Sequence, residues 1–376
     1  MAKEWRPNVM NKLIAITSIS LLASSCRPHT QMVSQERDPP AQPGESYANL
    51  SDDGAWCWFA DPRAIYHEGR HKRTYVGYVT GPEGTVIVSA FDHATKQVCS
   101  ATLRTFKRND HLNPVLLFRP DGRLMIFYCD QRGKDMYYRS TKNPEDITSW
   151  SDEKTIGVNT PGKANSYPNP IILKEENDRI YLIWRGGNRQ FCYTISDDGI
   201  KWSPAREFVK GGRAPYVKIY SSGRDRIHLA FSNDHPEYDA NSNIYYACYR
   251  NGRFFRADGT RIESVSNPPL TDSEAELVYH SSLSGRAYYT GGIALDHDDP
   301  SIVYLSKPTS GVFEIEKWVR NDADDSWSHR FVTAGSTRNN VRPFVPYGKS
   351  SDSIELIWMC GDYVSFTDFQ TELKMR

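Results

Sequence analysis

A phrase of about 45 to 50 residues recurs along the chain, and this repeat constrains the fold more than any other feature. Each copy holds a proline, an apolar strand, a polar turn with Gly or Asp, a second apolar strand, and then a loop and a third strand. Repeats of this length that consist of short strands are typical of four-stranded propeller blades. The prolines of the six clear copies are separated by 52, 56, 45, 85 and 43 residues and are Pro62, Pro114, Pro170, Pro215, Pro300 and Pro343.

The separation of 85 residues between Pro215 and Pro300 could hold two copies, and residues 275–292 read as a degenerate one. We therefore predict an all-β chain that forms one seven-bladed β-propeller over residues 45–376, instead of two or three domains. The 22 Tyr and 9 Trp agree with this prediction, because aromatic side chains suit the pleated surface of strands. The stretch Ser196–Trp202 is similar to a shortened Asp-box, the turn of sialidase-type repeats.

The residues before the repeats have the pattern of a bacterial export signal. Asn11 and Lys12 precede the apolar run Leu13–Ala23, which is too short for an ordinary transmembrane helix, and small residues then lead to Cys26. Small residues directly before a cysteine resemble the lipobox of bacterial lipoproteins. We expect residues 1–26 to be a lipoprotein signal peptide, with Cys26 as the lipidated residue.

Two further expectations follow for the amino-terminal region. Translation could start at Met10, and the polar, Pro-rich residues 27–44 would be a flexible tether to the propeller. The protein would cross the inner membrane of a bacterium and be held by its lipid in the periplasm or at the cell surface. The alternative is a plain secretory signal in which Cys26 carries no lipid.

The charge balance excludes one class of partner. The chain has 46 Lys and Arg against 46 Asp and Glu, and it has no block rich in Lys or Arg. A nucleic-acid binder needs a basic patch that neutralises phosphates, so we expect no nucleic-acid partner. We expect a monomer.

The repeat also predicts where ligand chemistry takes place. In a propeller, the loop that leads into the innermost strand and the loop that leaves the second strand open at the same end of the channel, which we call the mouth. Three residues before the repeat prolines lie His111, Tyr167 and His297, and no turn requires the first two. Asn113 precedes Pro114 directly, where an Asx turn would equally explain it. The other polar and aromatic residues predicted for this mouth are Arg132, Arg185, Arg213, Tyr216 and His235.

Several of these residues belong to phrases that, as a set, resemble one group of proteins. The phrases are Gly54–Arg63, Asp110-His111-Leu112-Asn113-Pro114, Ser166–Pro170, Trp184-Arg185-Gly186-Gly187 and Arg253–Thr260. Together they resemble the BNR-repeat propellers, the group that contains ulvan lyases and relatives acting on rhamnose–glucuronate linkages. The resemblance covers most of the chain after Gly44.

The resemblance implies a polysaccharide lyase in which a His and a Tyr flank a uronate and an Arg neutralises its carboxylate. Position by position, these residues are His111, Tyr167 and Arg185. Several relatives carry a second His after the next strand, where this chain has Gln131 within the stretch Cys129–Arg132.

The chemistry of β-elimination agrees with these residue types. The C5 proton of a uronate is weakly acidic until the neighbouring carboxylate is neutralised, and Arg185, with Arg132 or Arg213, could do this. A Tyr phenol acts as acid or base when a cation lies close to it, so Tyr167 is the predicted proton-transfer residue and His111 its partner. The remaining predicted contacts to the acidic oligo- or polysaccharide are Asn113, Tyr216, His235 and His297.

Two other functions remain open from the sequence. A glycoside hydrolase needs two facing carboxylates, and a sialidase needs an arginine triad. A surface lipoprotein that only binds glycans would use the same mouth without chemistry. The candidate carboxylates are Asp61, Asp110, Asp234 and Asp299, and the candidate triad is Arg63, Arg185 and Arg342.

No cofactor is required by this chemistry. His228, His235 and Cys248 lack the spacing of a standard zinc site. A structural metal ion, with His235 as a ligand, could still be held.

Overall fold

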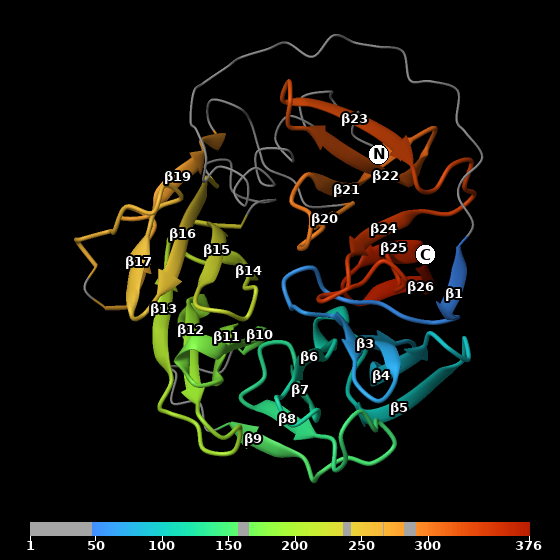
Figure 1. Cartoon of the computed structure of the whole chain (residues 1–376), viewed down its shortest axis with the longest axis horizontal. Helices are drawn as coiled ribbons and strands as arrows, with labels where there is room; N and C mark the ends of the chain where they lie inside the picture. Colours follow the sequence, from blue (N-terminus) through green and yellow to red (C-terminus); the bar gives the residue numbers. More distant parts are fainter. Residues whose placement is uncertain (1–46, 157–164, 236–241, 266, 282–290) are drawn as a thin grey trace.

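A computed structural model describes residues 47–156, 165–235, 242–265, 267–281 and 291–376 of the chain (Figure 1). Cys26, the signal segment 1–26 and the tether 27–44 lie outside these residues. No helix in the described ranges is long and apolar enough to cross a membrane.

The described strands form six sheets that are arranged as blades around a central channel (Figure 1). Blade 1 holds β2 (Ala64–Glu68), β3 (Lys72–Thr80), β4 (Thr85–Asp92) and β5 (Val98–Thr105). Blade 2 holds β6 (Val115–Phe118), β7 (Leu124–Cys129), β8 (Met136–Ser140) and β9 (Lys154–Ile156). Blade 3 holds β10 (Ser166–Leu173), β11 (Arg179–Arg185), β12 (Phe191–Ser196) and β13 (Arg206–Lys210).

The second half of the ring repeats this order. Blade 4 holds β14 (Tyr216–Tyr220), β15 (Ile227–Ser232), β16 (Ile244–Arg250) and β17 (Arg253–Phe255). Blade 5 holds β20 (Ile293–Leu295), β21 (Ile302–Thr309), β22 (Val312–Asn321) and β23 (Ser326–Phe331). Blade 6 holds β24 (Asn340–Phe344), β25 (Ile357–Ser365), β26 (Asp368–Met375) and β1 (Ala48–Ser51).

The all-β propeller is confirmed, but the prediction of seven blades is wrong, because six are present in the described part of the chain. Of residues 275–292, the stretch expected to form the seventh blade, residues 282–290 lie outside the described ranges, and the described part adds one short strand to blade 4. Leu270–Thr271 (β18) pairs in parallel with β13, and Glu276–Tyr279 (β19) pairs with β16. Strands of two and four residues on the outer edges of blades 3 and 4 therefore account for part of the long separation between repeats. Sequence spacing counts residues and does not reveal which strand a segment pairs with.

The amino-terminal strand closes the ring. β1 pairs antiparallel with β26, so the last blade contains strands from both ends of the described chain (Figure 1). Leu50 of β1 is buried and joins a core cluster that also holds Leu373 and Met375 of β26. This pairing covers the outer edge of β26, which would otherwise expose unpaired backbone groups.

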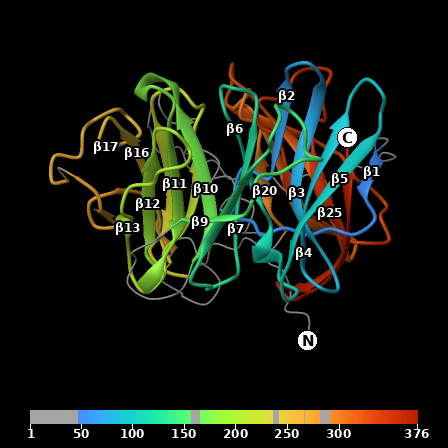
Figure 2. The ribbon, with the colours of Figure 1, turned by 90° about the horizontal axis from the view of Figure 1, so that it is seen from below.

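Burial within the blades follows from their stacking. The second strand of a blade is covered by both neighbouring blades, so β7 is buried at all six positions. The outer strand β23 alternates between exposed and partly buried positions. Figure 2 shows the ring from its edge, where the strands of the blades run from one end of the ring to the other.

Two second strands are anchored by the same kind of contact, in which a tryptophan donates to an asparagine at the beginning of the inner strand of its blade or directly before that strand. Nε1–H of Trp184 in β11 donates to Oδ1 of Asn165 at 2.9 Å, and Nε1–H of Trp358 in β25 donates to Oδ1 of Asn340 at 2.8 Å. Both tryptophans are fully buried. This anchor holds the position of Arg185, the residue that follows Trp184 and reaches the mouth.

Candidate active site

A cavity of about 530 Å³ opens at the end of the channel where the inner strands of the blades begin. We call it the mouth cavity. It is lined by seven of the residues predicted for this mouth, namely His111, Arg132, Tyr167, Arg185, Arg213, Tyr216 and His235. Repeat positions from blades 2, 3 and 4 are thus brought together, as the propeller register predicts.

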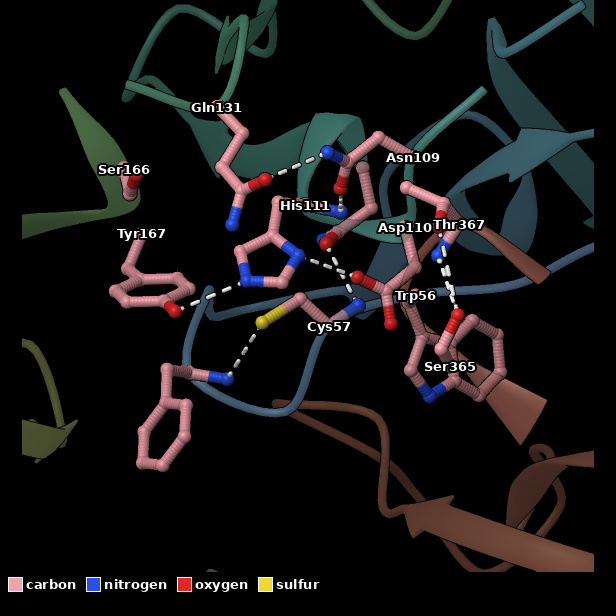
Figure 3. A network of polar contacts seen from close by, with 12 residues as sticks. Trp56, Cys57, Asn109, Asp110, His111, Gln131, Ser166, Tyr167, Ser365 and Thr367 are labelled. Atoms are coloured by element: carbon pink, nitrogen blue, oxygen red, sulfur yellow. Dashed lines mark hydrogen bonds and ion pairs between the residues drawn. The ribbon is translucent and has the colours of Figure 1, made fainter. Parts of the chain in front are cut away.

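His111 lies in a chain of hydrogen bonds at the floor of this cavity (Figure 3). It belongs to a short 3-10 helix, η2 (Asp110–Leu112), whose first turn is capped because Oδ1 of Asn109 accepts from the His111 N–H at 3.0 Å. Nδ1 of His111 lies 2.5 Å from Oδ1 of Asp110, and Nε2 lies 2.9 Å from Oη of Tyr167. The imidazole therefore connects a carboxylate to a phenol.

Asp110 is completely buried, yet it stays ionised. Its Oδ2 accepts from Nη1 of Arg342 at 2.6 Å and from the hydroxyl of Tyr363 at 2.7 Å. Burial opposes ionisation, but the charges of His111 and Arg342 outweigh it and lower the pKa of Asp110 to about 2. An ionised carboxylate only accepts hydrogen bonds, so Nδ1–H of His111 donates to Asp110, and the other ring nitrogen, Nε2, is the one that faces the Tyr167 hydroxyl.

Tyr167 has a strained backbone at the start of β10. Its φ of 60° lies in the left-handed region that aromatic residues rarely adopt, and the pairing of β10 with β11 is irregular between Ser166 and Asn169. The carbonyl of Tyr167 is held by Nδ2 of Asn169 at 2.8 Å. Burial raises the pKa of the Tyr167 phenol well above its usual value, although Arg185 acts in the opposite direction, so the phenol keeps its proton. Such strain is typical of functional positions.

Arg185 is a buried cation that no carboxylate of the described ranges neutralises. Its guanidinium lies over the ring of Tyr167 at 4.4 Å and over the ring of Tyr216 at 4.8 Å, and Nη2 lies 3.4 Å from Oη of Tyr167. No carboxylate of the described residues forms an ion pair with it, and its buried Nε has no hydrogen-bond partner there. Because a buried charge is costly unless it is paired, this site is suited to an anionic group of a ligand.

The other predicted residues of the mouth lie around this centre. Arg213 is 79% exposed and its Nε lies 3.6 Å from the carboxylate of Asp234. His235 packs edge-on against Tyr216, and burial together with the charge of Arg185 lowers the pKa of His235. Arg132 is exposed at the rim.

Two predicted contact residues lie elsewhere. Asn113 is buried beneath the cavity, where its Oδ1 accepts from the Cys57 N–H at 3.0 Å, so it holds a loop in place. The prediction that His297 lies at this mouth is wrong, because His297 follows the inner strand β20 instead of preceding one. Asp299 and Pro300 are in the turn to β21. His297 therefore stacks on Tyr220 at the other end of the channel.

The candidate pairs for a hydrolase do not assemble at the mouth. Asp234 is the one carboxylate that lines the mouth cavity in the described part of the chain. Asp61 is buried in ion pairs with Arg63 and Lys218, and Asp299 is exposed in a turn. Arg63 does not line the cavity either, so Arg63, Arg185 and Arg342 form no arginine triad there.

Cys57, Asp110 and His111 offer donor atoms that lie within 4.8 Å of one another, but they do not fit a metal ion well. Asp110 already accepts from His111, Arg342 and Tyr363, and the Arg342 guanidinium would repel a cation. Burial raises the pKa of the Cys57 thiol to about 12, so it stays protonated. His235 belongs to no such group among the described residues, and a structural metal ion stays a prediction.

Several residues of the site have no counterpart in the sequence prediction. From the sequence, Asp110 is only a candidate hydrolase carboxylate, although its position next to His111 in the Asp-His phrase is a signal for a supporting role. Arg189 lines the mouth cavity from the loop after Arg185. Tyr363 and Phe366 reach the cavity from the β25–β26 hairpin, and the repeat pattern holds no signal for that reach.

Comparison with known proteins places the fold in a wider group. A family profile described as "BNR repeat-containing family member" matches residues 73–335. A polysaccharide lyase PL25 ulvan lyase, solved bound to -[GlcA(1-4)Rha3S]-, superposes with a TM-score of 0.64 at 15% identity over 87% of this chain and 95% of that one. The polysaccharide lyase Uly1 superposes with a TM-score of 0.54 at 12% identity over 91% and 94%. No curated protein sequence matches the chain. At these identities the likeness shows the fold.

Proposed function

The chain belongs to the BNR repeat-containing family, and we propose that it is a polysaccharide lyase that cleaves a uronate-containing, rhamnose-rich glycan by β-elimination. One observation carries this proposal. The buried Arg185, which pairs with no described carboxylate, lies beside the hydrogen-bonded pair of His111 and Tyr167 in a single cavity. An anion site next to two proton-transfer groups is what elimination from a uronate needs.

Arg185 would bind the uronate carboxylate. Removal of the C5 proton places negative charge on that carboxylate, and a guanidinium that forms two parallel hydrogen bonds stabilises the charge where it develops. The interaction is strong in this cavity because Arg185 is 5% exposed and water is largely excluded from it. The aromatic rings of Tyr167 and Tyr216 hold the guanidinium in place from below.

His111 and Tyr167 would divide the proton transfers. Nε2 of His111 takes the C5 proton as the base, and the ionised Asp110 stabilises the imidazolium that forms. The Tyr167 phenol, which keeps its proton because its pKa is raised, gives that proton to the glycosidic oxygen as the C4–O bond breaks. The imidazolium then returns a proton to the phenolate across the 2.9 Å contact, and both groups regain their starting states.

The substrate class is supported by charge and by the solved relatives. Arg132, Arg189 and Arg213 surround the cavity, and Asp234 alone opposes them among the described carboxylates that line it. An acidic glycan suits such a surface. The similar ulvan lyase was solved with a glucuronate–rhamnose ligand, which makes that linkage the first to test.

The alternatives predict different observations. A hydrolase needs a second carboxylate facing the first, and the lining of this cavity offers none in the residues described. A protein that only binds glycans would use the same arginines and aromatic rings but would not need the hydroxyl of Tyr167.

The test is incubation with ulvan and with rhamnosyl-glucuronate oligosaccharides, with absorbance and reducing ends followed together. A lyase yields a C4–C5 double bond that absorbs at about 235 nm, in step with new reducing ends. Tyr167→Phe should abolish the absorbance and retain binding. New reducing ends without absorbance would show a hydrolase, and binding without either signal would show a glycan-binding protein.

We also propose that Cys26 carries a lipid that holds the enzyme at a bacterial membrane. Expression in a bacterium followed by fractionation tests this point. Wild-type protein should be recovered with the membranes, and Cys26→Ser should be released into the soluble fraction. Equal distribution of both would show a plain secretory signal.

A further inference from the structure

The mouth cavity has an apolar side that the proposed chemistry does not use. Six large hydrophobic side chains are exposed in the described part of the chain, and of these only Val364 and Phe366 line the mouth cavity. They are 74% and 42% exposed. Exposed apolar side chains inside a polar ligand cavity indicate a contact surface for a ligand.

Contacts with Asp110 hold the hairpin that carries these two residues. They lie at the tip of the β25–β26 hairpin, where the Phe366 carbonyl accepts from the Asp110 N–H at 2.8 Å. Tyr363, at the base of the tip, donates to Asp110 and lies under the Arg342 guanidinium at 4.1 Å. The tip is therefore held by the backbone N–H of Asp110, and its base by the carboxylate that also supports His111.

The apolar tip lies next to the proton-transfer pair. The Phe366 ring packs edge-on against the His111 ring at 5.3 Å between centroids, and the Tyr167 ring lies 5.1 Å from His111. His111 thus contacts Tyr167 on blade 3 and Phe366 on blade 6. Of the arginines that line the cavity, Arg185 and Arg189 belong to blade 3, Arg213 to the loop between blades 3 and 4, Arg132 to blade 2, and Arg342, which pairs with Asp110, to blade 6. His111 thus connects the blade that carries Arg185 to the blade that carries the apolar tip.

We propose that Val364 and Phe366 form a subsite for the sugar that adjoins the uronate. This inference rests on the proposed function. When the uronate carboxylate lies on Arg185 and the uronate C5 faces His111, the sugar next to the uronate reaches the Phe366 ring, because that ring packs against His111. An aromatic ring and an isopropyl group bind the apolar C–H face of an uncharged pyranose or the methyl group of a 6-deoxy sugar. Phe366 then determines specificity and takes no part in proton transfer.

Binding in a non-reacting background tests the subsite. The parent is Tyr167→Phe, and the probes are D-glucuronate and the rhamnosyl-glucuronate disaccharide in both linkage orders, measured by calorimetry. Adding Phe366→Ala should weaken the binding of one of the two disaccharides by about 10-fold, or about 1.4 kcal/mol. The Kd of glucuronate should stay unchanged. Phe366→Trp should restore the disaccharide affinity. The matched control is Ile200→Ala, which truncates a hydrophobic side chain of 59% exposure outside the mouth cavity. This control should change neither the Kd of the disaccharides nor that of glucuronate.

The outcomes separate the two proposals. Unchanged disaccharide affinity, or equal weakening of disaccharide and monosaccharide, would overturn the subsite. If the wild-type protein produces no unsaturated product while the disaccharide result holds, the lyase proposal fails and the subsite stands. Failure of the parent to bind any of the probes would overturn the subsite, and the unsaturated product of the wild-type protein decides the lyase proposal separately. In a wild-type background that is active, Phe366→Ala should raise KM and leave the pH dependence of kcat unchanged, which a disturbed His111 would alter.

Discussion

Asp110 of blade 2 and Arg342 of blade 6 form a buried ion pair in which Nη1 lies 2.6 Å from Oδ2. The pair crosses the loop that leads into blade 1, and the same guanidinium donates to the Trp56 carbonyl of that loop at 2.6 Å. Three blades are thereby fixed relative to one another beneath the mouth cavity. The other carboxylate oxygen of Asp110 faces His111. The carboxylate thus couples the closure of the ring to the orientation of the proposed base.

Asp110→Asn should lower kcat by about 100-fold or more with little change in KM, because the amide cannot stabilise the imidazolium of His111. Steady-state absorbance kinetics measure the effect. Tyr363→Phe is the control, since it removes one hydrogen bond to Asp110 but keeps the charge of Asp110 and its contact with His111. This control should lower kcat only a few-fold. A kcat for Asp110→Asn close to that of wild type would show that Asp110 is purely structural.

The same carboxylate should produce a characteristic acid dependence of stability. The pKa of Asp110 falls from 3.8 to about 2 on folding, so its contribution is fully present above pH 3.8 and is lost as the pH falls towards 2. The difference in unfolding free energy between wild type and Asp110→Asn should therefore shrink by about 2 kcal/mol over that interval. Urea unfolding at a series of pH values measures this difference. A constant difference would mean that folding does not lower the pKa of Asp110.

Arg185→Met should separate activity from stability. Loss of the proposed carboxylate partner should lower kcat/KM by about 1,000-fold. The free energy of unfolding should stay the same or rise by about 1 kcal/mol, because a buried cation without a counter-charge is removed. Arg63→Met is the matched control, since Arg63 is equally buried but pairs with Asp61 at 2.9 Å, and its removal should destabilise by about 3 kcal/mol. Equal destabilisation by both changes would indicate that Arg185 has a structural counter-charge.

The centre of the site could be predicted because repeat register and propeller geometry act together. Tyr167 and Arg185 lie at the beginning of an inner strand and the end of a second strand in blade 3, and His111 precedes the inner strand of blade 2, so the fold itself brings them to one end. His297 shows the limit of this reasoning. It precedes a proline as His111 does, but that proline lies in a turn at the opposite end of its strand.

The remaining parts of the site depend on how far side chains and hairpins reach between blades. The contacts of Asp110 with Arg342 and Tyr363 join residues more than 200 positions apart in the chain. Phe366 reaches the mouth because β25 and β26 are long, and their length depends on the pairing between these two strands of blade 6. The blade count failed for a related reason, since β18 and β19 pair with blades that were already complete.

Removal of β1 should open the ring. A chain that begins at Gly54 lacks the strand that pairs with β26 and the buried side chain of Leu50, and it exposes the edge of blade 6. We expect a loss of about 3 kcal/mol in unfolding free energy, from one buried leucine and several strand hydrogen bonds. Urea unfolding of this chain is compared with that of a chain that begins at Tyr47, which keeps β1 and should match the longer protein. Equal stability of the two truncated chains would show that contacts such as the Asp110–Arg342 pair are sufficient to close the ring.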